Sequence, residues 1–327
     1  MVKIGICFSK ELIGQNPLSH IGEKLPVYLH FLSLCQKQGW EVYVLTRKTY
    51  QGEGVFAGAW LFEKQGSAEG RFLFTKGKFK PLKKTIKMDL IYDRTGGVKF
   101  PPKEKTKMKV VDSRDFKLLC WDKWLAYRKL GNYMPQTFWV GEKNNLASIL
   151  PQIKTDWVVL KPYNGLRGLG VFIGPKKEAM SFEFPGKFKK YIAQEFIDTS
   201  GGIPKITTGL HDLRIALLNG KPVWSRIIIP PQGSFSAHTA GGGILKEVDY
   251  ELVPDLTKKI VLEITPKFYR EYDNPFFSLD FGFDKNGRPW LFEINDQIGF
   301  PLWKMKKRNL FLKELVKNFA QKLKGVK

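Results

Sequence analysis

Apolar and polar positions follow two different periods at the start of the chain. Residues 2–8 (VKIGICF) and 41–46 (EVYVLT) are short apolar runs that predict buried strands. Between them, apolar positions recur at helical spacing over 24–38, and Gly39 ends the predicted helix. A strand, a helix and a second strand in this order predict the beginning of a parallel α/β unit.

The pattern weakens after the second strand. Residues 51–80 are rich in Gly, Phe and Lys and predict loops and short strands, and 89–93 (DLIYD) predicts one more strand. Pro101-Pro102 and the lysine-rich run 103–109 then predict a boundary between lobes.

The remaining chain mixes helices with antiparallel strands. We expect helices at 115–130, 252–264 and 304–324. We expect strands at 110–113, 157–161, 171–173, 191–196, 213–218, 222–229, 276–283 and 289–295. The inward side of the first helix is expected to carry Leu118, Leu119, Trp121, Leu125 and Leu130. Asn219-Gly220 and Asp284–Gly287 are turn signals that predict two hairpins.

Composition narrows the class of protein. A chain of 327 residues with 43% apolar residues suggests two or three packed lobes. Neither a transmembrane run nor a signal peptide is apparent, and no membrane partner is expected. The three cysteines and four histidines are scattered, which argues against zinc and favours a reduced, cytoplasmic protein. The sequence is compatible with a homo-oligomer.

The net charge of +23 is the strongest bulk signal. It fits a nucleic-acid surface, a field that gathers anionic small molecules such as ATP or acidic substrates, or an unspecific lysine-rich surface. The lysines are spread along the chain, and no nucleic-acid recognition motif is present. Nucleic acid is therefore the least expected partner.

A glycine-rich segment lies between two predicted strands. Lys161 ends one strand, and Gly165, Gly168 and Gly170 follow before the next. Because no helix follows, the pattern is neither a dinucleotide fingerprint nor a Walker loop. Backbone N–H groups of such a loop can approach phosphate oxygens, with Lys161 as a fixed positive charge. The alternative is an ordinary glycine-rich hairpin with a surface lysine.

Three oxygen-bearing side chains flank the last predicted hairpin. Glu293 and Asn295 share one face of their strand, and an even-numbered turn places Asp280 on the same face. Two carboxylates and an amide suit Mg²⁺, and burying carboxylates among apolar neighbours without a cation is costly. The alternative is a set of exposed polar positions on an edge hairpin.

Two further segments are candidates for binding. His211-Asp212-Leu213-Arg214 opens a strand that pairs with one carrying Arg226, and Asp212 and Arg214 point the same way. Arg214 and Arg226 are candidates to stabilise a transferring phosphoryl group, although an Asp212–Arg214 structural ion pair is the alternative. Gln194, Glu195, Phe196 and Ile197 form an apolar extended segment that can present backbone groups to an adenine edge, or a plain core strand.

Taken in order, these elements resemble the ATP-grasp superfamily, in particular the branch of glutathione synthetase, ribosomal-protein glutamate ligases and spore-coat-associated proteins. The resemblance covers about 110–300. It implies an α/β fold with an N-terminal pre-ATP-grasp domain (1–105), a small lobe with a glycine-rich lid (106–190) and a large lobe with a metal-binding hairpin (191–327).

The resemblance also implies roles for individual residues. Lys123 and Lys161, with the glycine lid, look like the phosphate-binding elements, and the segment Gln194–Ile197 looks like the adenine hinge. HDLR, with Asp212, is similar to a strand of the glutamate ligases. The metal signature D…E-I-N implies Asp280, Glu293 and Asn295 as ligands of one or two Mg²⁺ ions. His238, in the segment ending in a triple glycine, departs from the relatives, so the substrate stays open.

The activity implied is an ATP-dependent ligase that joins a small-molecule or peptide carboxylate to an amine through an acyl phosphate. Arg226 and Arg214 would offset the charge of that intermediate. Two alternatives share the fold: a coat or scaffold protein that binds nucleotide without turnover, and a kinase-like phosphotransferase.

Overall fold

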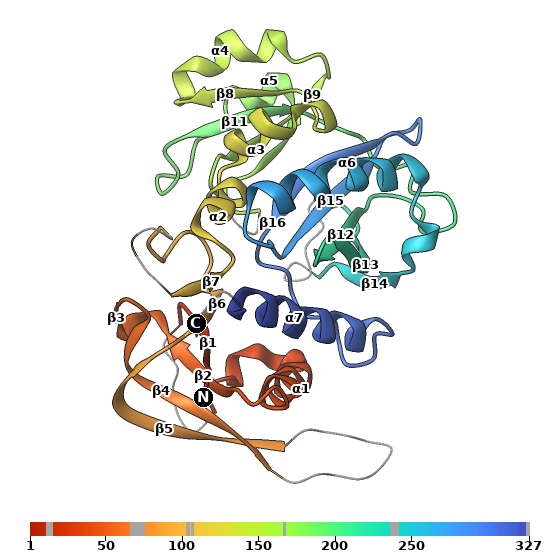
Figure 1. Cartoon of the computed structure of the whole chain (residues 1–327). Helices are drawn as coiled ribbons and strands as arrows, with labels where there is room; N and C mark the ends of the chain where they lie inside the picture. The colour runs from red at the N-terminus through yellow and green to blue at the C-terminus, as the bar shows by residue number, and fades with distance from the viewer. Residues whose placement is uncertain are drawn as a thin grey trace.

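The computed structural model describes residues 1–10, 16–65, 76–102, 105, 108–165, 168–235 and 242–324 (Figure 1). Within these residues the strands form three sheets of seven, four and five strands. The five-stranded sheet lies between the seven-stranded sheet at one end of the molecule and the four-stranded sheet at the other (Figure 1). Every helix in these ranges falls short of the length and apolar character needed to cross a membrane.

The seven-stranded sheet contains the predicted parallel α/β unit. Its strands are β1 (Lys3–Phe8), β2 (Glu41–Thr46), β3 (Tyr50–Gly52), β4 (Val55–Gln65), β5 (Lys76–Lys87), β6 (Leu90–Arg94) and β7 (Lys109–Val111). β1 pairs in parallel with both β2 and β6. Helix α1 (Leu25–Gln36) buries Phe31, Leu32 and Cys35 against this lobe. A 3-10 turn, η1 (Ser19–Lys24), precedes it.

Two features of this lobe differ from the expectations. β4 and β5 form one long antiparallel hairpin where loops and short strands were expected. Much of β5 is exposed on both faces, so its sequence lacks the alternation that marks a half-buried strand. The sheet also continues past residue 105, because β7 pairs in parallel with β6.

The single helix expected at 115–130 is two helices, α2 (Arg114–Trp121) and α3 (Lys123–Leu130). Asp122 separates them with an extended backbone, and its Oδ1 accepts hydrogen bonds from the N–H groups of Trp124 and Leu125. An aspartate in this position is a favourable N-cap and starts a new helix. Leu125, expected to face inward, is exposed as a result.

The four-stranded sheet forms a small antiparallel lobe. Its strands, in the order β10-β9-β11-β8, are β8 (Thr137–Gly141), β9 (Trp157–Pro162), β10 (Phe172–Pro175) and β11 (Tyr191–Glu195). β8 was not expected. Two short helices, α4 (Leu146–Ile149) and α5 (Lys176–Ala179), contribute to its apolar core.

The five-stranded sheet carries most of the candidate site. Its strands, in the order β14-β13-β12-β15-β16, are β12 (Asp212–Leu218), β13 (Lys221–Ile229), β14 (Ile244–Val248), β15 (Phe277–Phe283) and β16 (Pro289–Asn295). β14 was not expected. Asn219 and Gly220 both have positive φ, as the predicted hairpin turn requires.

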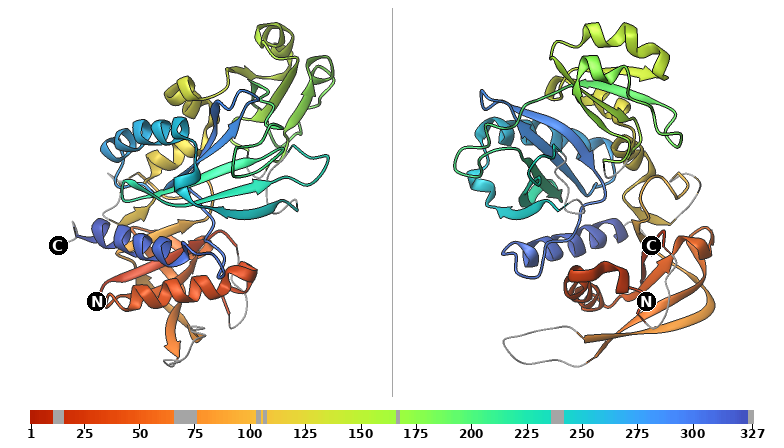
Figure 2. Two further views of the ribbon diagram at one scale, coloured as in Figure 1. Left: turned by 90° about the vertical axis from the view of Figure 1, so that its right-hand side faces the viewer. Right: turned by 180° about the vertical axis from the view of Figure 1, so that it is seen from behind.

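Two helices cover opposite faces of this sheet. α6 (Asp255–Glu271) packs on one face and runs seven residues past its expected end at 264, through Pro266. α7 (Arg308–Leu323) packs on the other face and against α1, so it lies between the sheet and the first lobe (Figure 2). Phe300, between β16 and α7, stacks on Tyr28 of α1 at a centroid distance of 4.2 Å. These contacts hold the first lobe over one edge of the candidate site.

Candidate functional site

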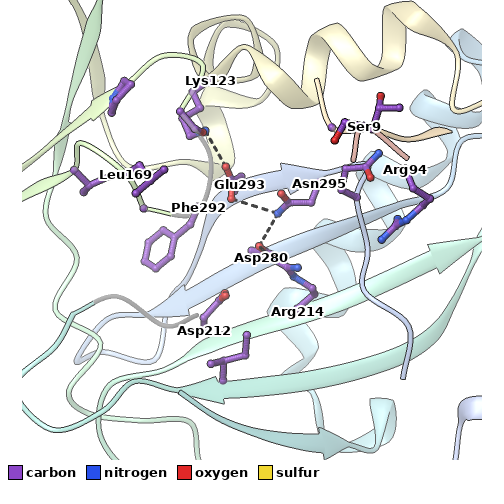
Figure 3. Close-up of a pocket in the computed structure, with 18 of the residues that line it drawn as sticks. Ser9, Arg94, Lys123, Leu169, Asp212, Arg214, Asp280, Phe292, Glu293 and Asn295 are labelled. Atoms are coloured by element: carbon purple, nitrogen blue, oxygen red, sulfur yellow. Dashed lines mark hydrogen bonds and ion pairs between the residues drawn. The ribbon is translucent and has the colours of Figure 1, made fainter. Parts of the chain in front are cut away.

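Asp280 and Glu293 share one face of the predicted metal-binding hairpin as expected, but the turn between the paired strands has five residues, 284–288, and not an even number. Asp280 on β15 lies directly opposite Glu293 on β16, and Ser278 lies opposite Asn295. Asn295 Nδ2 donates to Asp280 Oδ2 at 2.7 Å and to Glu293 Oε2 at 3.3 Å (Figure 3). The structure therefore brings the three side chains into one cluster. A bulge follows at Phe292, which turns its ring into the same cavity.

Two cations hold the carboxylates of this cluster. Arg214 binds Asp280 with both ends of its guanidinium, Nε to Oδ1 at 2.7 Å and Nη2 to Oδ2. Lys123 Nζ lies 2.9 Å from Glu293 Oε1. The alternative of an ion pair between Asp212 and Arg214 is therefore wrong, since the partner of Arg214 is the adjacent-strand Asp280.

The donor set fits a hard divalent cation. Within the described ranges no three His, Cys, Asp or Glu side chains gather as a metal site, so the set depends on the amide of Asn295. Carboxylate and amide oxygens are the ligands that Mg²⁺ prefers. Asp212, on the neighbouring strand, has a buried Oδ1 without a hydrogen-bond partner. Such an orphaned acceptor beside the cluster is consistent with a site for a cation or its water.

Burial and charge set the protonation of the acids. Burial raises the pKa of Asp280, although Arg214 opposes the shift. Burial and the charge of Asp280 raise the pKa of Asp212 well above its ordinary value. Burial acts in the same direction on Glu293, but Lys123 outweighs it and lowers the pKa of that carboxyl group. Glu293 is thus the acid most strongly held in its charged form.

The two predicted phosphate lysines adjoin the glycine-rich loop, one through a contact with Gly165 and the other at the end of the strand before it. Lys123 is the first residue of α3, and its Nζ also donates to the carbonyl oxygen of Gly165 at 2.8 Å. Lys161, near the end of β9, donates to Gln194 Oε1 at 2.8 Å. Burial, and then the charge of Lys123, lower the pKa of Lys161 from 10.5 to about 8. Both side chains line the same cavity of about 720 Å³.

The glycines of the loop have different surroundings. Gly165 and Gly168 line the cavity, together with the exposed Leu169. Gly170 does not line it; its carbonyl accepts from the Tyr191 hydroxyl at 2.9 Å. Gly168 and Gly170 have φ of 69° and 75°, the left-handed region that favours glycine.

The predicted adenine segment borders a second, smaller cavity of about 230 Å³. Its lining includes Gln194, Glu195, Phe196 and Ile197 together with Val159, Ile173, Leu210 and Phe235. The backbone N–H of Glu195 donates to Gln136 O at 2.9 Å, and that of Phe196 to Thr155 Oγ1 at 3.2 Å. These two N–H groups are therefore not available to a ligand, so only the other backbone groups of the segment can contact an adenine edge.

Arg226 lies directly across β13 and β12 from Arg214 and lines the larger cavity. Its side chain is buried, and its Nε has no hydrogen-bond partner among the described residues. Burial, and then Arg214, lower its pKa to about 10. A buried guanidinium in this state requires an anion or water for its remaining donors.

The first lobe supplies cavity residues that were not predicted. Ser9 and Lys10 follow β1, Arg94 ends β6, and Thr95 and Gly96 follow it; all five line the larger cavity. The sequence contained a signal for these residues, because they lie at the carboxyl ends of parallel strands, where ligands bind in such sheets. Of the residues singled out from the sequence, His238 and Gly241 lie outside the described residues.

Comparisons with known proteins bear on the fold. The sequence matches no protein-family model and no curated protein sequence. Solved structures do match over nearly the whole chain. D-alanyl-alanine synthetase A from Vibrio cholerae has a TM-score of 0.65 at 13% identity, covering 99% of this chain and 98% of its own.

Two further structures agree in fold. A RimK-domain ATP-grasp protein from Sphaerobacter thermophilus has a TM-score of 0.56 at 12% identity, with 98% of each chain covered. The ATP-grasp ligase PsnB, solved with a precursor variant, Mg and ADP, has a TM-score of 0.55 at 11% identity and the same coverage. The fold predicted from the order of motifs is confirmed: this chain has the ATP-grasp fold.

Proposed function

We propose that this protein is an ATP-dependent ligase that joins a carboxylate to an amine. The observation that carries the proposal is the meeting of the two cavities. Lys161, Gly168, Asp280, Phe292 and Glu293 line both of them. The small cavity is largely apolar and the larger one is charged. The boundary between them is therefore formed by a lysine, the glycine loop and a pair of carboxylates.

This arrangement suits a nucleotide that spans both cavities. The adenine would occupy the smaller cavity, beside Phe196 and Ile197. Its phosphates would then lie at the junction, where Lys123 and Lys161 offer charge and the loop offers backbone N–H groups. Asp280, Glu293 and Asn295 would hold Mg²⁺, which would neutralise phosphate charge at that junction.

The larger cavity then receives the acid. A substrate carboxylate oxygen attacks the γ-phosphorus of ATP, the bond to the β–γ bridging oxygen breaks, and ADP leaves. The amine attacks the resulting acyl phosphate, phosphate departs, and the amine loses a proton. Arg226 would contact the acid, because its guanidinium has no carboxylate partner among the described residues.

Arg214 has a different place in this proposal. Both ends of its guanidinium bind Asp280, so it positions a metal ligand and adds positive charge nearby. The loop around Leu169 would exclude water from the acyl phosphate, which water would otherwise hydrolyse. The compared structures support the proposal, because they are a synthetase and a ligase, and the ligase was solved with Mg and ADP.

The test is turnover. The protein, ATP and Mg²⁺ are incubated with a panel of amino acids and short peptides, and ADP and products are measured by mass spectrometry. We expect ADP formation that depends on both an acid and an amine, with an amide product of matching mass. A phosphorylated product that persists when amines are added indicates a kinase, and bound nucleotide without any turnover indicates a binding protein; either result contradicts ligation.

A further inference from the structure

Three cations, Lys24, Arg94 and Arg226, lie within electrostatic reach of one another beside the larger cavity. Lys24 is the last residue of η1, Arg94 ends β6, and Arg226 lies on β13. Arg94 and Arg226 line the cavity, and in Figure 3 Arg94 lies beyond Asn295, on the side away from Lys123. Two lobes thus contribute positive charge to one region.

The glutamate that lies opposite Arg226 on the adjacent strand accepts hydrogen bonds from other groups and not from Arg226. Glu247 lies opposite Arg226 across β13 and β14. Its two oxygens accept from the N–H groups of Lys306 at 2.7 Å and Lys307 at 2.9 Å, in the turn before α7. Arg226 therefore has a glutamate beside it and no ion pair with it.

Arg94 is also without a carboxylate partner in the described part of the chain. Its Nη1 donates to the Tyr92 hydroxyl at 3.2 Å. Asp296 is within electrostatic reach of Arg94, but it is ion-paired with the buried Lys117, which also pairs with Asp93 at 3.3 Å. Lys117 is thus the contact partner of both Asp93 and Asp296, and neither acid forms an ion pair with Arg94 in the described part of the chain.

Lys24 is held close to the two arginines. Its Nζ lies where a Cβ on Gly299 would be only 3.1 Å away, so the glycine leaves room for the ammonium group. Burial, and then the charges of Arg226 and Arg94, lower the pKa of Lys24 to about 8. Like charges gathered in a partly buried region repel one another, and an anion bound among them relieves that repulsion.

We propose that the acid substrate carries a second anionic group, which Lys24 and Arg94 bind, while Arg226 lies between this group and the reacting carboxylate. The inference rests on the proposed ligase function and specifies its substrate class as a compact dianion. A dicarboxylate and a phosphonocarboxylate share this chemistry. The first lobe then acts as the specificity element, because it supplies both binding cations.

The test compares acids that differ only in the second charge. Succinate and succinamate, and L-glutamate and L-glutamine, are titrated calorimetrically into the protein saturated with Mg-ADP. We expect each dianion to bind at least about tenfold more tightly than its amide, since a charge-assisted contact contributes on that order. 3-Phosphonopropionate distinguishes the two kinds of second anionic group. If it binds more tightly than succinate, the second group of the substrate is phosphate-like; if it binds more weakly, the second group is a carboxylate.

Substitutions test whether Lys24 and Arg94 cause the preference for the dianion over its amide. Lys24→Met and Arg94→Met should each reduce the preference for the dianion about tenfold and leave Mg-ADP affinity within about twofold. Arg94→Lys should restore part of it, and Lys83→Met, at an exposed position on β5, should change nothing. Equal binding of acid and amide, or an unchanged preference in both Met variants, overturns the inference. If the wild-type protein does not bind Mg-ADP, that result instead contradicts the proposed function.

Discussion

Lys123 and Glu293 form an ion pair between the first residue of α3 and strand β16, with Nζ 2.9 Å from Oε1. The same Nζ donates to Gly165 in the loop after β9. One lysine therefore connects a helix start, the glycine-rich loop and a carboxylate. Its position follows from Asp122, whose cap ends one helix and begins the next.

Glu293→Gln should abolish ADP formation, with a loss of about a thousandfold or more, because a neutral amide weakens both magnesium binding and the contact with Lys123. The free energy of unfolding should change by less than about 1 kcal/mol, since the pair is partly exposed. ADP release and urea unfolding measure the two effects. The exposed Glu178→Gln is the matched control, and wild-type turnover in Glu293→Gln would contradict the metal assignment.

The pKa of Lys161 predicts a pH dependence. Because this pKa is about 8, the ammonium that attracts phosphate predominates at pH 7, is half lost at pH 8 and is largely lost at higher pH. The affinity for Mg-ATP should therefore begin to fall between pH 7 and pH 8 and decrease further towards pH 9.5. Lys161→Met should bind about tenfold more weakly at pH 7, with a flat profile. Equal wild-type affinities at pH 7 and pH 9.5 would show that this lysine does not hold the phosphates.

Gly170→Ala should destabilise the loop after β9. A Cβ at Gly170 would lie 2.7 Å from the Phe188 ring, and the positive φ adds a cost of about 1–2 kcal/mol. Thermal unfolding and the KM for ATP report the effect. Gly186→Ala is the control, because a Cβ there meets no atom within 4 Å. Similar behaviour of the two variants would argue against a constrained glycine at position 170.

Arg214 and Asp280 should be strongly coupled. Arg214→Met leaves a buried carboxylate without its bidentate partner and should lower the free energy of unfolding by about 3 kcal/mol. Asp280→Asn in the same background should cost less than it does alone, with a coupling of at least about 1 kcal/mol. A double-mutant cycle by urea unfolding at pH 7 measures this term, and additive effects would be inconsistent with the observed pair.

Parts of this site were predictable from local sequence. The turn signal at Asp284–Gly287 predicted the hairpin, whereas the pairing of Asp280 with Glu293 also depends on the bulge at Phe292, and alternation then placed Asn295 on the same face as Glu293. The Gly-rich loop and the segment Gln194–Ile197 were recognised by their order along the chain. The roles assigned to these residues stay predictions.

Other parts depend on contacts that sequence patterns do not encode. Arg214 and Asp280 are 66 residues apart and meet only because β12 lies beside β15. Arg94 reaches the cavity because the first lobe is held over it by α7 and by the stacking of Tyr28 on Phe300. Such non-local packing has no signature in a window of the sequence.

Mg-ATP is expected to bind at the junction of the two cavities. Isothermal titration of ATP into the protein, with and without Mg²⁺, measures this binding, with Lys161→Met as the site-specific comparison. We expect one site per chain, tighter with Mg²⁺ than without, and about tenfold weaker in the variant. No heat of binding, or an affinity that neither Mg²⁺ nor Lys161 affects, would contradict it.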